Sequence, residues 1–341
     1  MQLSTLKRFR FFLRSMRYFY QWNRRVADID YPPFVVSIEP TNYCNLRCPM
    51  CPQSEKRDID YGLMSTELYA KIINEIKHYA REVILNIGGE PLMNKRLPEF
   101  VQMASDAGLY VKFDTNAMLL NEQWTEKILD SPLDEITFSF DSEDKATYEY
   151  MRARAKFETV VQNMQYFLKE KKRRKQSQPR VVLQSIKLFK PHQPLDVGPA
   201  YRQLFEGLPV DEYRGVWAHD WVGTVETGKY TLPPREKAHY HPCRLLWKNI
   251  TVSWDGNVYL CCLDLNRQEL VDNVRDKSML DVWFGARMRA ARQRLTEERN
   301  HESVICNSCD LLYERPEFSA QGLKRVVQEN LRHFPVKIHS T

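Results

Sequence analysis

The chain has 341 residues, of which 43% are hydrophobic and 28% charged, and its net charge is +6 at pH 7. This composition is typical of a globular protein with one large domain and a small one, or with two ordinary domains. No apolar run reaches the ~20 residues that a transmembrane helix needs, and basic residues interrupt the first apolar residues, which argues against a secretory signal peptide. Eight cysteines in such a chain predict metal or redox chemistry in the cytoplasm, not a disulfide framework.

The chain begins with a basic segment, residues 6–25, in which aromatic residues lie between arginines. As a helix this segment would be amphipathic. Two interpretations stay open: peripheral contact with an anionic membrane surface or a lipid-linked substrate, and a helix packed across one end of the main domain. The second arrangement is the more common one. A later basic run, residues 169–175, is typical of the solvated end of a helix, so nucleic-acid binding is not expected.

Strand-like and helix-like segments alternate from residue 34 to residue 217. The strand candidates are residues 34–39, 83–87, 110–115, 135–140, 180–188 and 212–217. The helical candidates are residues 66–79, 97–107, 121–129, 157–171 and 194–205. This alternation predicts an α/β fold with a parallel sheet and helices outside it. Six such strands can form a partial (β/α)6 barrel of the TIM type.

Polar or glycine-containing segments follow four of the predicted strands. A cysteine-containing loop follows the first strand. The residues after the second, third and fourth strands are Gly88, Gly89, Glu90 and Pro91, then Asn116, then Asp141. Because the carboxyl ends of barrel strands carry the chemistry, we expect these residues to meet at one mouth of the barrel.

The pattern changes after the predicted barrel. Residues 218–242 contain glycines and prolines and are interpreted as a linker. Residues 247–254, an Asp255-Gly256 turn and residues 257–261 predict a β-hairpin, and Ser278 is a suitable cap for a helix from residue 279 to about 295. The predicted domains are an N-terminal helix (1–33), the barrel (34–217), the linker, a small domain of hairpin plus helix (243–312) and a tail (313–341).

The most informative motif is CxxxCxxC, formed by Cys44, Cys48 and Cys51 directly after the first strand. Three thiolates on one loop can hold three irons of a [4Fe–4S] cluster and leave the fourth iron for a small molecule. A zinc site is the alternative, but it would usually need a fourth Cys or His nearby.

This motif resembles that of the radical S-adenosylmethionine (SAM) superfamily. The resemblance implies that SAM occupies the open iron and is split reductively to a 5′-deoxyadenosyl radical, which abstracts a hydrogen atom from the substrate. Gly88, Gly89, Glu90 and Pro91 resemble the GGEP motif of the family, in which the glycines admit the methionine part of SAM and the carboxylate meets its ammonium group. A reducing partner such as flavodoxin or ferredoxin is also implied.

Further cofactor contacts follow from the same resemblance. Met50 stands where the family often has an aromatic residue against the adenine, and Ser139 and Asp141 resemble the segment that binds the ribose. Asn116 resembles part of a TNG-like segment of uncertain role. Asp141 could instead cap a helix. Arg152 could meet the carboxylate of SAM, although a surface salt bridge is the more common role for such a residue.

A second cysteine set lies in the last hundred residues: Cys243, Cys261, Cys306 and Cys309. It resembles the truncated "twitch" form of a SPASM domain, which implies one auxiliary [4Fe–4S] cluster with four protein ligands. Structural zinc is the alternative, because a CxxC pair is equally a zinc knuckle. Cys262 should point away from Cys261 if the strand is regular, and so into the core.

A fully ligated auxiliary cluster implies electron transfer, which favours a dehydrogenase acting on a small or carrier-linked polar substrate such as a sugar or an aminocyclitol-like alcohol. A redox-neutral epimerase, a SPASM-type peptide modifier and a metal-binding nucleic-acid scaffold are the alternatives. The 33 residues before the first strand are fewer than the ~80 that a leader-peptide domain would take, which counts against the peptide reading. Tyr213, Trp217 and Trp221 could line the substrate pocket, and His219 and Asp220 are weak catalytic candidates.

Overall fold

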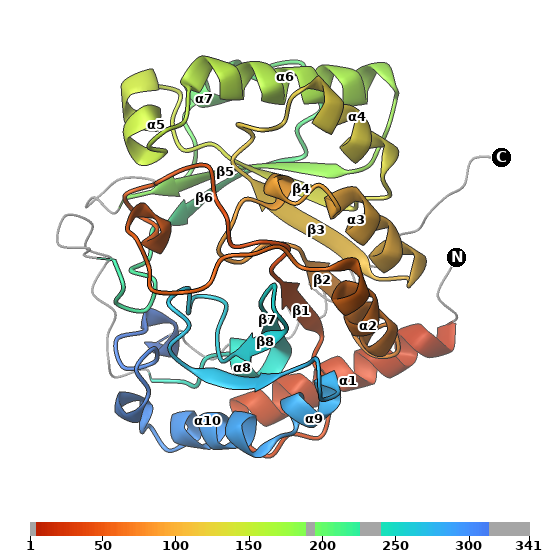
Figure 1. The fold of residues 1–341 in the computed structure, drawn as a ribbon, viewed down its shortest axis with the longest axis vertical. Coiled ribbons are helices and arrows are strands. Elements are labelled where there is room, and N and C mark those ends of the chain that lie inside the picture. Colours follow the sequence, from red (N-terminus) through yellow and green to blue (C-terminus); the bar gives the residue numbers. More distant parts are fainter. Residues whose placement is uncertain (1–4, 189–194, 226–239, 314–341) are drawn as a thin grey trace.

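The computed structural model describes residues 5–188, 195–225 and 240–313. Within them, nine strands form one sheet in the order β6-β5-β4-β3-β2-β1-β7-β8-β9 (Figure 1). All the pairings from β1 to β6 are parallel. These six strands are β1 (Val35–Ile38), β2 (Glu82–Ile84), β3 (Tyr110–Thr115), β4 (Glu135–Ser139), β5 (Arg180–Lys187) and β6 (Glu212–Trp217). The predicted open (β/α)6 barrel is confirmed.

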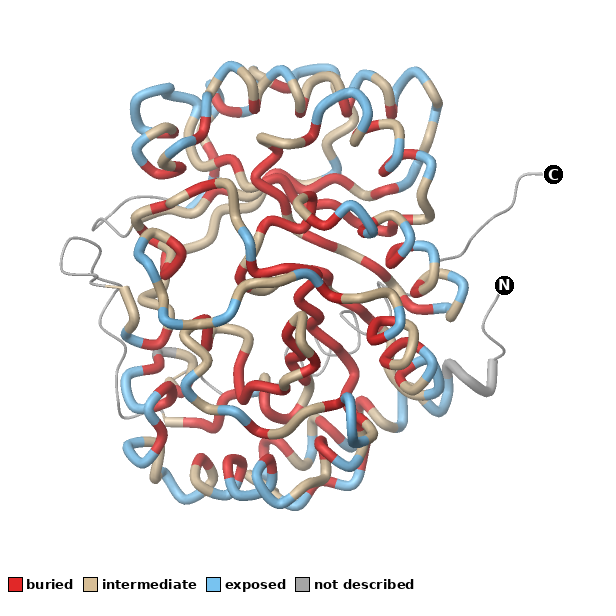
Figure 2. The backbone as a smooth tube through the Cα atoms, in the orientation of Figure 1, coloured by how far each residue is buried: buried red, intermediate tan, exposed pale blue. Residues whose placement is uncertain are grey.

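Helices cover the outer side of the six strands (Figure 1). They are α2 (Thr66–Ile76), α3 (Leu97–Asp106), α4 (Glu122–Asp130), α5 (Lys145–Met151), α6 (Phe157–Arg173) and α7 (Pro199–Gln203). Helix α2 shows why they form: Ser65 accepts a hydrogen bond from the N–H of Leu68 as its N-cap, and the apolar side chains from Leu68 to Ile76 are buried on one face. Figure 2 shows the same division, with buried strands inside and exposed helix faces outside.

Strand β3 shows which side of the sheet is polar. Val111 and Phe113 are fully buried, whereas the alternate residues Lys112 and Asp114 are only partly buried. Lys112 pairs with Glu82 at 2.9 Å, and further along the sheet Arg180 pairs with Glu135 at 2.9 Å. The amino-terminal halves of the strands are therefore joined by ion pairs, and the carboxyl ends are left for the site.

The C-terminal hairpin extends the barrel sheet, which the sequence analysis did not anticipate. Strand β7 (Asn249–Val252) pairs in parallel with β1, with Val35 opposite Asn249 and Ile38 opposite Val252. Strands β8 (Asn257–Tyr259) and β9 (Leu270–Asn273) then continue antiparallel. The two parts of the chain thus share one sheet, and β1 lies between them.

Two local predictions in this region are wrong. The hairpin turn has four residues, 253–256, because β7 ends at Val252, and helix α8 (Leu245–Lys248) occupies the start of the predicted first strand. The single predicted helix after Ser278 is two helices, α9 (Met279–Trp283) and α10 (Ala286–Thr296). Gly285, whose backbone is extended, separates them. Only glycine fits at this position, because a Cβ there would lie 2.7 Å from the carbonyl oxygen of Asp281. The cap at Ser278 is confirmed.

The N-terminal segment forms helix α1 (Thr5–Asn23), which packs across one end of the fold beside α8 (Figure 1). Tyr18 and Trp22 are buried, and the Trp22 indole donates a hydrogen bond of 2.8 Å to the carbonyl oxygen of Pro242. The packed arrangement is therefore confirmed. Phe9, Phe12, Leu13 and Tyr20 are exposed on the other face, and membrane contact there stays a prediction. In the described part of the chain, every helix is too short or too polar to cross a lipid bilayer.

Parts of the predicted linker and tail, residues 226–239 and 314–341, lie outside the described residues.

Candidate functional site

The loop that carries Cys44, Cys48 and Cys51 begins just after β1. Thr41 and Asn42 fix its start: the Thr41 hydroxyl donates to the carbonyl oxygen of Gly62, and the Asn42 amide donates to that of Asp60, each at 2.8 Å. Further on, the N–H of Cys51 donates to the carbonyl oxygen of Cys48 at 3.0 Å. The three thiols are therefore presented on a braced loop that turns tightly at its end.

The thiols of this loop are largely buried, and burial raises their pKa, to about 12 for Cys44 and about 11 for Cys51. The backbone N–H groups of Leu46 and Gln53 act in the opposite direction on these two sulfurs. Burial also raises the pKa of Cys48, and the Arg152 guanidinium lowers it. Such donors favour the thiolate form once a metal cation supplies the missing positive charge.

The Gly88–Pro91 motif follows β2 and packs directly on the cysteine loop. A Cβ at Gly89 would lie 2.2 Å from the carbonyl oxygen of Thr41, so only glycine fits here. The N–H of Glu90 donates to the carbonyl oxygen of Tyr43 at 2.8 Å. Pro91 begins a short 3-10 helix, Pro91–Met93. The two loops therefore form one unit.

Glu90 is buried, with both carboxylate oxygens hydrogen-bonded. One oxygen accepts from the Thr115 hydroxyl at 2.7 Å and the N–H of Leu92 at 3.2 Å, and the other accepts from the N–H of Asn116 at 2.9 Å. Burial raises its pKa to about 7 although these donors oppose the shift. A bound cation would stabilise the ionised form.

A cavity of about 310 Å³ lies at the carboxyl ends of the strands. It brings together most of the residues predicted for the barrel site: Cys44, Cys48, Met50, Cys51, Gly88, Gly89, Glu90, Asn116, Ser139, Arg152, Trp217, His219 and Trp221. Four residues predicted for the barrel site are not among its lining residues: Pro91, Asp141, Tyr213 and Asp220. Three of the four polar strand ends that we expected to meet at one mouth therefore line this cavity, and the fourth, Asp141, does not.

Asn86, Asp114 and Gln184 also line the cavity, although none of them was predicted from the sequence. Asn86 donates to a carboxylate oxygen of Asp114 at 3.4 Å, and burial raises the pKa of Asp114. A signal was present for Asp114, because polar residues alternate with apolar ones along β3.

Asp141 and Arg152 form a buried ion pair, in which Arg152 lines the cavity and Asp141 lies behind it. The Arg152 Nε donates to one carboxylate oxygen of Asp141 at 2.6 Å and Nη2 to the other at 3.1 Å, and the N–H of Ile186 adds a bond of 2.8 Å. The two side chains are 1% and 10% exposed, so the expected surface salt bridge is wrong. The capping alternative for Asp141 is also wrong, because Asp144 caps α5.

The residues after β6 separate into two groups. Trp217, His219 and Trp221 line the cavity, and burial lowers the pKa of His219, which favours the neutral ring. Tyr213 instead packs against Tyr201 and Arg202. Asp220 lies close enough to Cys309 to raise the pKa of that thiol.

The second cysteine set is buried as well. Burial raises the pKa of Cys243 far above its usual range, with further contributions from Cys261, Cys309 and Cys306. The N–H of Leu263 donates to the Cys261 sulfur at 3.4 Å, and the N–H of Cys309 donates to the carbonyl oxygen of Cys306 at 3.3 Å. These four residues therefore lie close together around a tight turn.

The expected orientation of Cys262 is wrong. Strand β8 ends at Tyr259, so regular alternation stops before Cys261 and Cys262. The thiol of Cys262 instead interacts electrostatically with those of Cys261, Cys243 and Cys309. Cys262 thus lies beside the second cysteine set.

Comparison with known proteins decides the family. Residues 38–182 match the radical SAM superfamily, and residues 243–310 match the SPASM iron–sulfur cluster-binding domain. The chain belongs to the radical SAM superfamily. A C-terminal SPASM domain follows its radical SAM domain; the first implies auxiliary iron–sulfur clusters, and the second implies SAM and a [4Fe–4S] cluster.

Two curated relatives match part of this radical SAM chain. The PqqA peptide cyclase of Bradyrhizobium diazoefficiens is 32% identical over 117 residues, which cover 34% of this chain and 31% of the relative. A probable GTP 3′,8-cyclase of Methanococcus maripaludis is 32% identical over 134 residues, 39% of this chain and 44% of the relative. The matched segment thus spans between about a third and under half of these relatives.

Solved structures share the fold at low identity. BtrN in complex with AdoMet and 2-DOIA has a TM-score of 0.56 and 19% identity, with 83% of this chain and 94% of BtrN covered. Streptococcus suis SuiB bound to the precursor peptide SuiA has a TM-score of 0.62 and 12% identity, with 90% and 79% covered. At such identities the likeness concerns the radical SAM fold alone.

The residues of this radical SAM chain fit the cofactors of the family. Both cysteine sets supply buried thiols with backbone N–H donors near their sulfurs. In the described ranges, no three Cys, His, Asp or Glu side chains converge closely enough to hold one metal ion. A four-iron cluster does not need such convergence, because each iron binds a different cysteine.

Proposed function

We propose that this radical SAM enzyme abstracts a hydrogen atom from a small or carrier-linked polar substrate held in the cavity beside Cys44, Cys48 and Cys51. When bound there, SAM and its reduced cluster supply a 5′-deoxyadenosyl radical. The observation that carries the proposal is that one cavity is lined by the three cysteines, the glycine motif and polar strand residues.

The cofactor-binding residues have distinct proposed roles. The three cysteines hold three irons, and Glu90 accepts the ammonium group of SAM, for which its buried carboxylate is suited. Gly88 and Gly89 let the backbone approach the methionine part. Met50, Asn116 and Ser139 contact the adenosyl part, with Met50 offering an apolar and polarisable surface. Pro91 acts indirectly by forming the turn that follows the glycines. Asp141 acts indirectly by orienting Arg152.

The substrate side of the cavity favours a polar, hydrogen-bonding molecule. Asn86, Asp114 and Gln184 offer both donors and acceptors, which suits hydroxyl or amino groups. Trp217 and Trp221 add apolar ring surface, and a few convergent polar groups beside such surface are typical of small-molecule pockets. An amino alcohol or polyol meets these requirements. His219 and Asp220 remain the candidates for proton transfer, and His219 is the better placed of the two because it lines the cavity.

The second cysteine set would accept an electron. Removal of a hydrogen atom leaves a substrate radical, and loss of one proton and one electron from that radical completes a two-electron oxidation. An auxiliary cluster held by Cys243, Cys261, Cys306 and Cys309 would take that electron. Flavodoxin or ferredoxin would serve as the external redox partner.

Peptide modification is the second candidate. Two solved neighbours are described with peptides, SuiB with SuiA and anSMEcpe with Cp18Cys, and a curated relative is a peptide cyclase. Redox-neutral epimerisation is the third candidate, because it needs no electron acceptor.

A mass measurement on the product separates these candidates. Reconstituted, reduced enzyme is incubated with SAM and panels of amino alcohols, polyols and short peptides, and 5′-deoxyadenosine and product masses are recorded. We expect an amino alcohol or polyol to raise 5′-deoxyadenosine formation and to lose two hydrogen atoms. Turnover of peptides alone, or exchange of one hydrogen for deuterium in D2O without oxidation, would contradict the proposal.

A further inference from the structure

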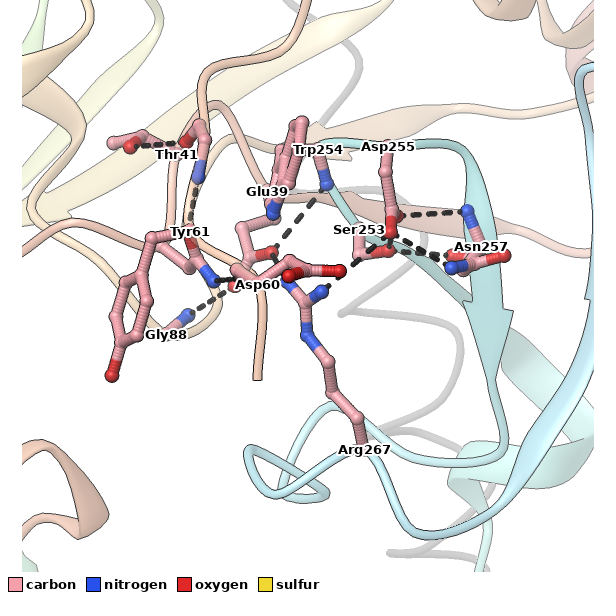
Figure 3. A network of polar contacts seen from close by, with 12 residues as sticks. Glu39, Thr41, Asp60, Tyr61, Gly88, Ser253, Trp254, Asp255, Asn257 and Arg267 are labelled. Atoms are coloured by element: carbon pink, nitrogen blue, oxygen red, sulfur yellow. Dashed lines mark hydrogen bonds and ion pairs between the residues drawn. The ribbon is translucent and has the colours of Figure 1, made fainter. Parts of the chain in front are cut away.

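A buried ion pair joins the end of β1 to the loop that follows Cys261. One carboxylate oxygen of Glu39 lies 3.1 Å from Nη2 of Arg267, and the side chains are 5% and 10% exposed (Figure 3). Glu39 belongs to the barrel, whereas Arg267 belongs to the SPASM domain. A buried pair of this kind holds its two elements in a fixed relation, since losing either partner leaves an uncompensated charge.

The other oxygen of Glu39 faces the glycine motif. It accepts a hydrogen bond of 3.3 Å from the N–H of Gly88. A Cβ at Gly88 would lie 3.0 Å from this oxygen and 3.2 Å from Cδ2 of Leu265, which belongs to the same loop as Arg267. Gly88 is therefore held between the Glu39 carboxylate and the SPASM loop.

The loop that presents Arg267 is itself rigid. Arg267 has a φ of 58°, an uncommon left-handed conformation for an arginine. Asp264 holds it there: its carbonyl oxygen accepts from the N–H of Arg267 at 3.2 Å, and its carboxylate accepts from those of Gln268 and Glu269, each at 2.9 Å. A strained residue fixed by its surroundings in this way is typical of a position with a functional constraint.

The same loop is tied to the second cysteine set at its far end. The Ser303 hydroxyl donates to the Glu269 carboxylate, and the N–H of Cys306 donates to the Ser303 oxygen at 3.1 Å. A continuous series of polar contacts therefore leads from Cys306 through Ser303, Glu269 and the 264–269 loop to Arg267, Glu39 and Gly88.

We propose that Glu39 and Arg267 are positioning residues. Through them, SAM binding at Gly88–Gly89 depends on whether the second cysteine set holds its metal. The proposal rests on the proposed function in one respect, namely that the glycine motif binds SAM. When the second set holds its metal, Cys306 and Ser303 hold the Glu269 end of the loop in place, and Arg267 orients Glu39, which orients Gly88. By reciprocity, bound SAM also stabilises metal at the second set.

The test measures the dissociation constant of SAM by equilibrium dialysis with anaerobically reconstituted protein. Arg267→Met should weaken SAM binding about 5- to 50-fold, within the usual range of coupling between sites, and Arg267→Lys should restore part of the loss. Cys306→Ala should weaken it by a similar factor. The double variant should bind SAM no more weakly than the single variant with the lower affinity, because both substitutions act through one series of contacts.

A second readout reports on the contact itself. Hydrogen exchange at the Gly88 amide should accelerate in Arg267→Met and in Glu39→Gln. The second variant provides the test if Arg267→Met does not fold. Arg287→Met is the matched control, because Arg287 bonds the carbonyl oxygen of Val271 elsewhere in the same domain and should leave both readouts unchanged.

Each outcome decides between the proposals. Wild-type SAM affinity in Arg267→Met, or losses that multiply in the double variant, overturns the positioning role and leaves the proposed function intact. Failure of the wild-type holoenzyme to bind SAM overturns the proposed function and the positioning role together.

Discussion

The indole N–H of Trp221 donates a hydrogen bond of 2.8 Å to the carbonyl oxygen of Met50. This bond joins the segment after β6 to the cysteine loop, between Cys48 and Cys51. Trp221 and Val222 both have positive φ, 50° and 55°, so the backbone turns sharply to bring the indole there. The segment that crosses the cavity is thereby attached to the loop that carries the thiols.

Replacing Trp221 by Phe should loosen the cysteine loop. An aromatic ring is retained and one partly buried hydrogen bond is lost, about 1 kcal/mol, with the carbonyl oxygen of Met50 left unsatisfied. We expect faster loss of iron from the anaerobic protein, about 3- to 10-fold, followed by absorbance during chelator challenge. Trp124→Phe, remote from the cavity, is the control, and equal rates in both variants would contradict the role of this bond.

Replacing Glu90 by Gln should weaken SAM binding. A charged hydrogen bond contributes about 1.5–3 kcal/mol, so we expect a dissociation constant about 10- to 100-fold higher by equilibrium dialysis. Glu122→Gln, an exposed residue in the first turn of α4, should have no effect. An unchanged affinity in Glu90→Gln would mean that another group meets the ammonium of SAM.

The pH dependence of SAM binding should report the same carboxyl group. Burial raises the pKa of Glu90 to about 7, and Arg152 lowers it only in part. Below that pH the group is neutral, so SAM affinity should fall as pH decreases, by up to about tenfold per unit. In the SAM-free protein the sign is opposite: the raised pKa favours folding at low pH and disfavours it as pH rises from about 4.5 towards 7. A flat affinity profile between about pH 6 and 8 that Glu90→Gln does not alter would exclude titration of Glu90.

Replacing Arg152 by Met should lower stability. The change leaves the Asp141 carboxylate buried without its cation, which typically costs about 3–5 kcal/mol in the free energy of unfolding. Urea denaturation of the metal-free protein measures it. Arg173→Met breaks an exposed pair with Glu170 and should cost at most about 1 kcal/mol. Similar losses in the two variants would mean that Asp141 is compensated by other groups.

Metal analysis tests the assignment of the second cysteine set. Anaerobically purified protein should contain about eight irons and as many acid-labile sulfides, and Cys309→Ala should retain about four of each. About four irons together with zinc in the wild-type protein would instead assign the second set to structural zinc.

The barrel could be predicted because its signals are local. The alternation of strand-like and helix-like segments and the cysteine spacing both lie within short windows of sequence. The pairing of β1 with β7 could not, since the partners are far apart in the chain and a short apolar strand carries no mark of its neighbour. The break at Gly285 depends on a close backbone approach that only the folded chain reveals.

The candidate site shows the same limit. Cysteines and glycines with a recognisable spacing were found, whereas Asn86 and Gln184 become site residues only when the strands are assembled. Arg267 carries no sequence signal, because its importance comes from burial against Glu39.

The most direct test is the formation of 5′-deoxyadenosine from SAM by the reduced, reconstituted protein, quantified by mass spectrometry. We expect formation by the wild-type protein and none by Cys48→Ala, whereas Trp124→Phe should match the wild type. Equal amounts of 5′-deoxyadenosine from Cys48→Ala and the wild type would show that the three-cysteine loop does not carry out the cleavage.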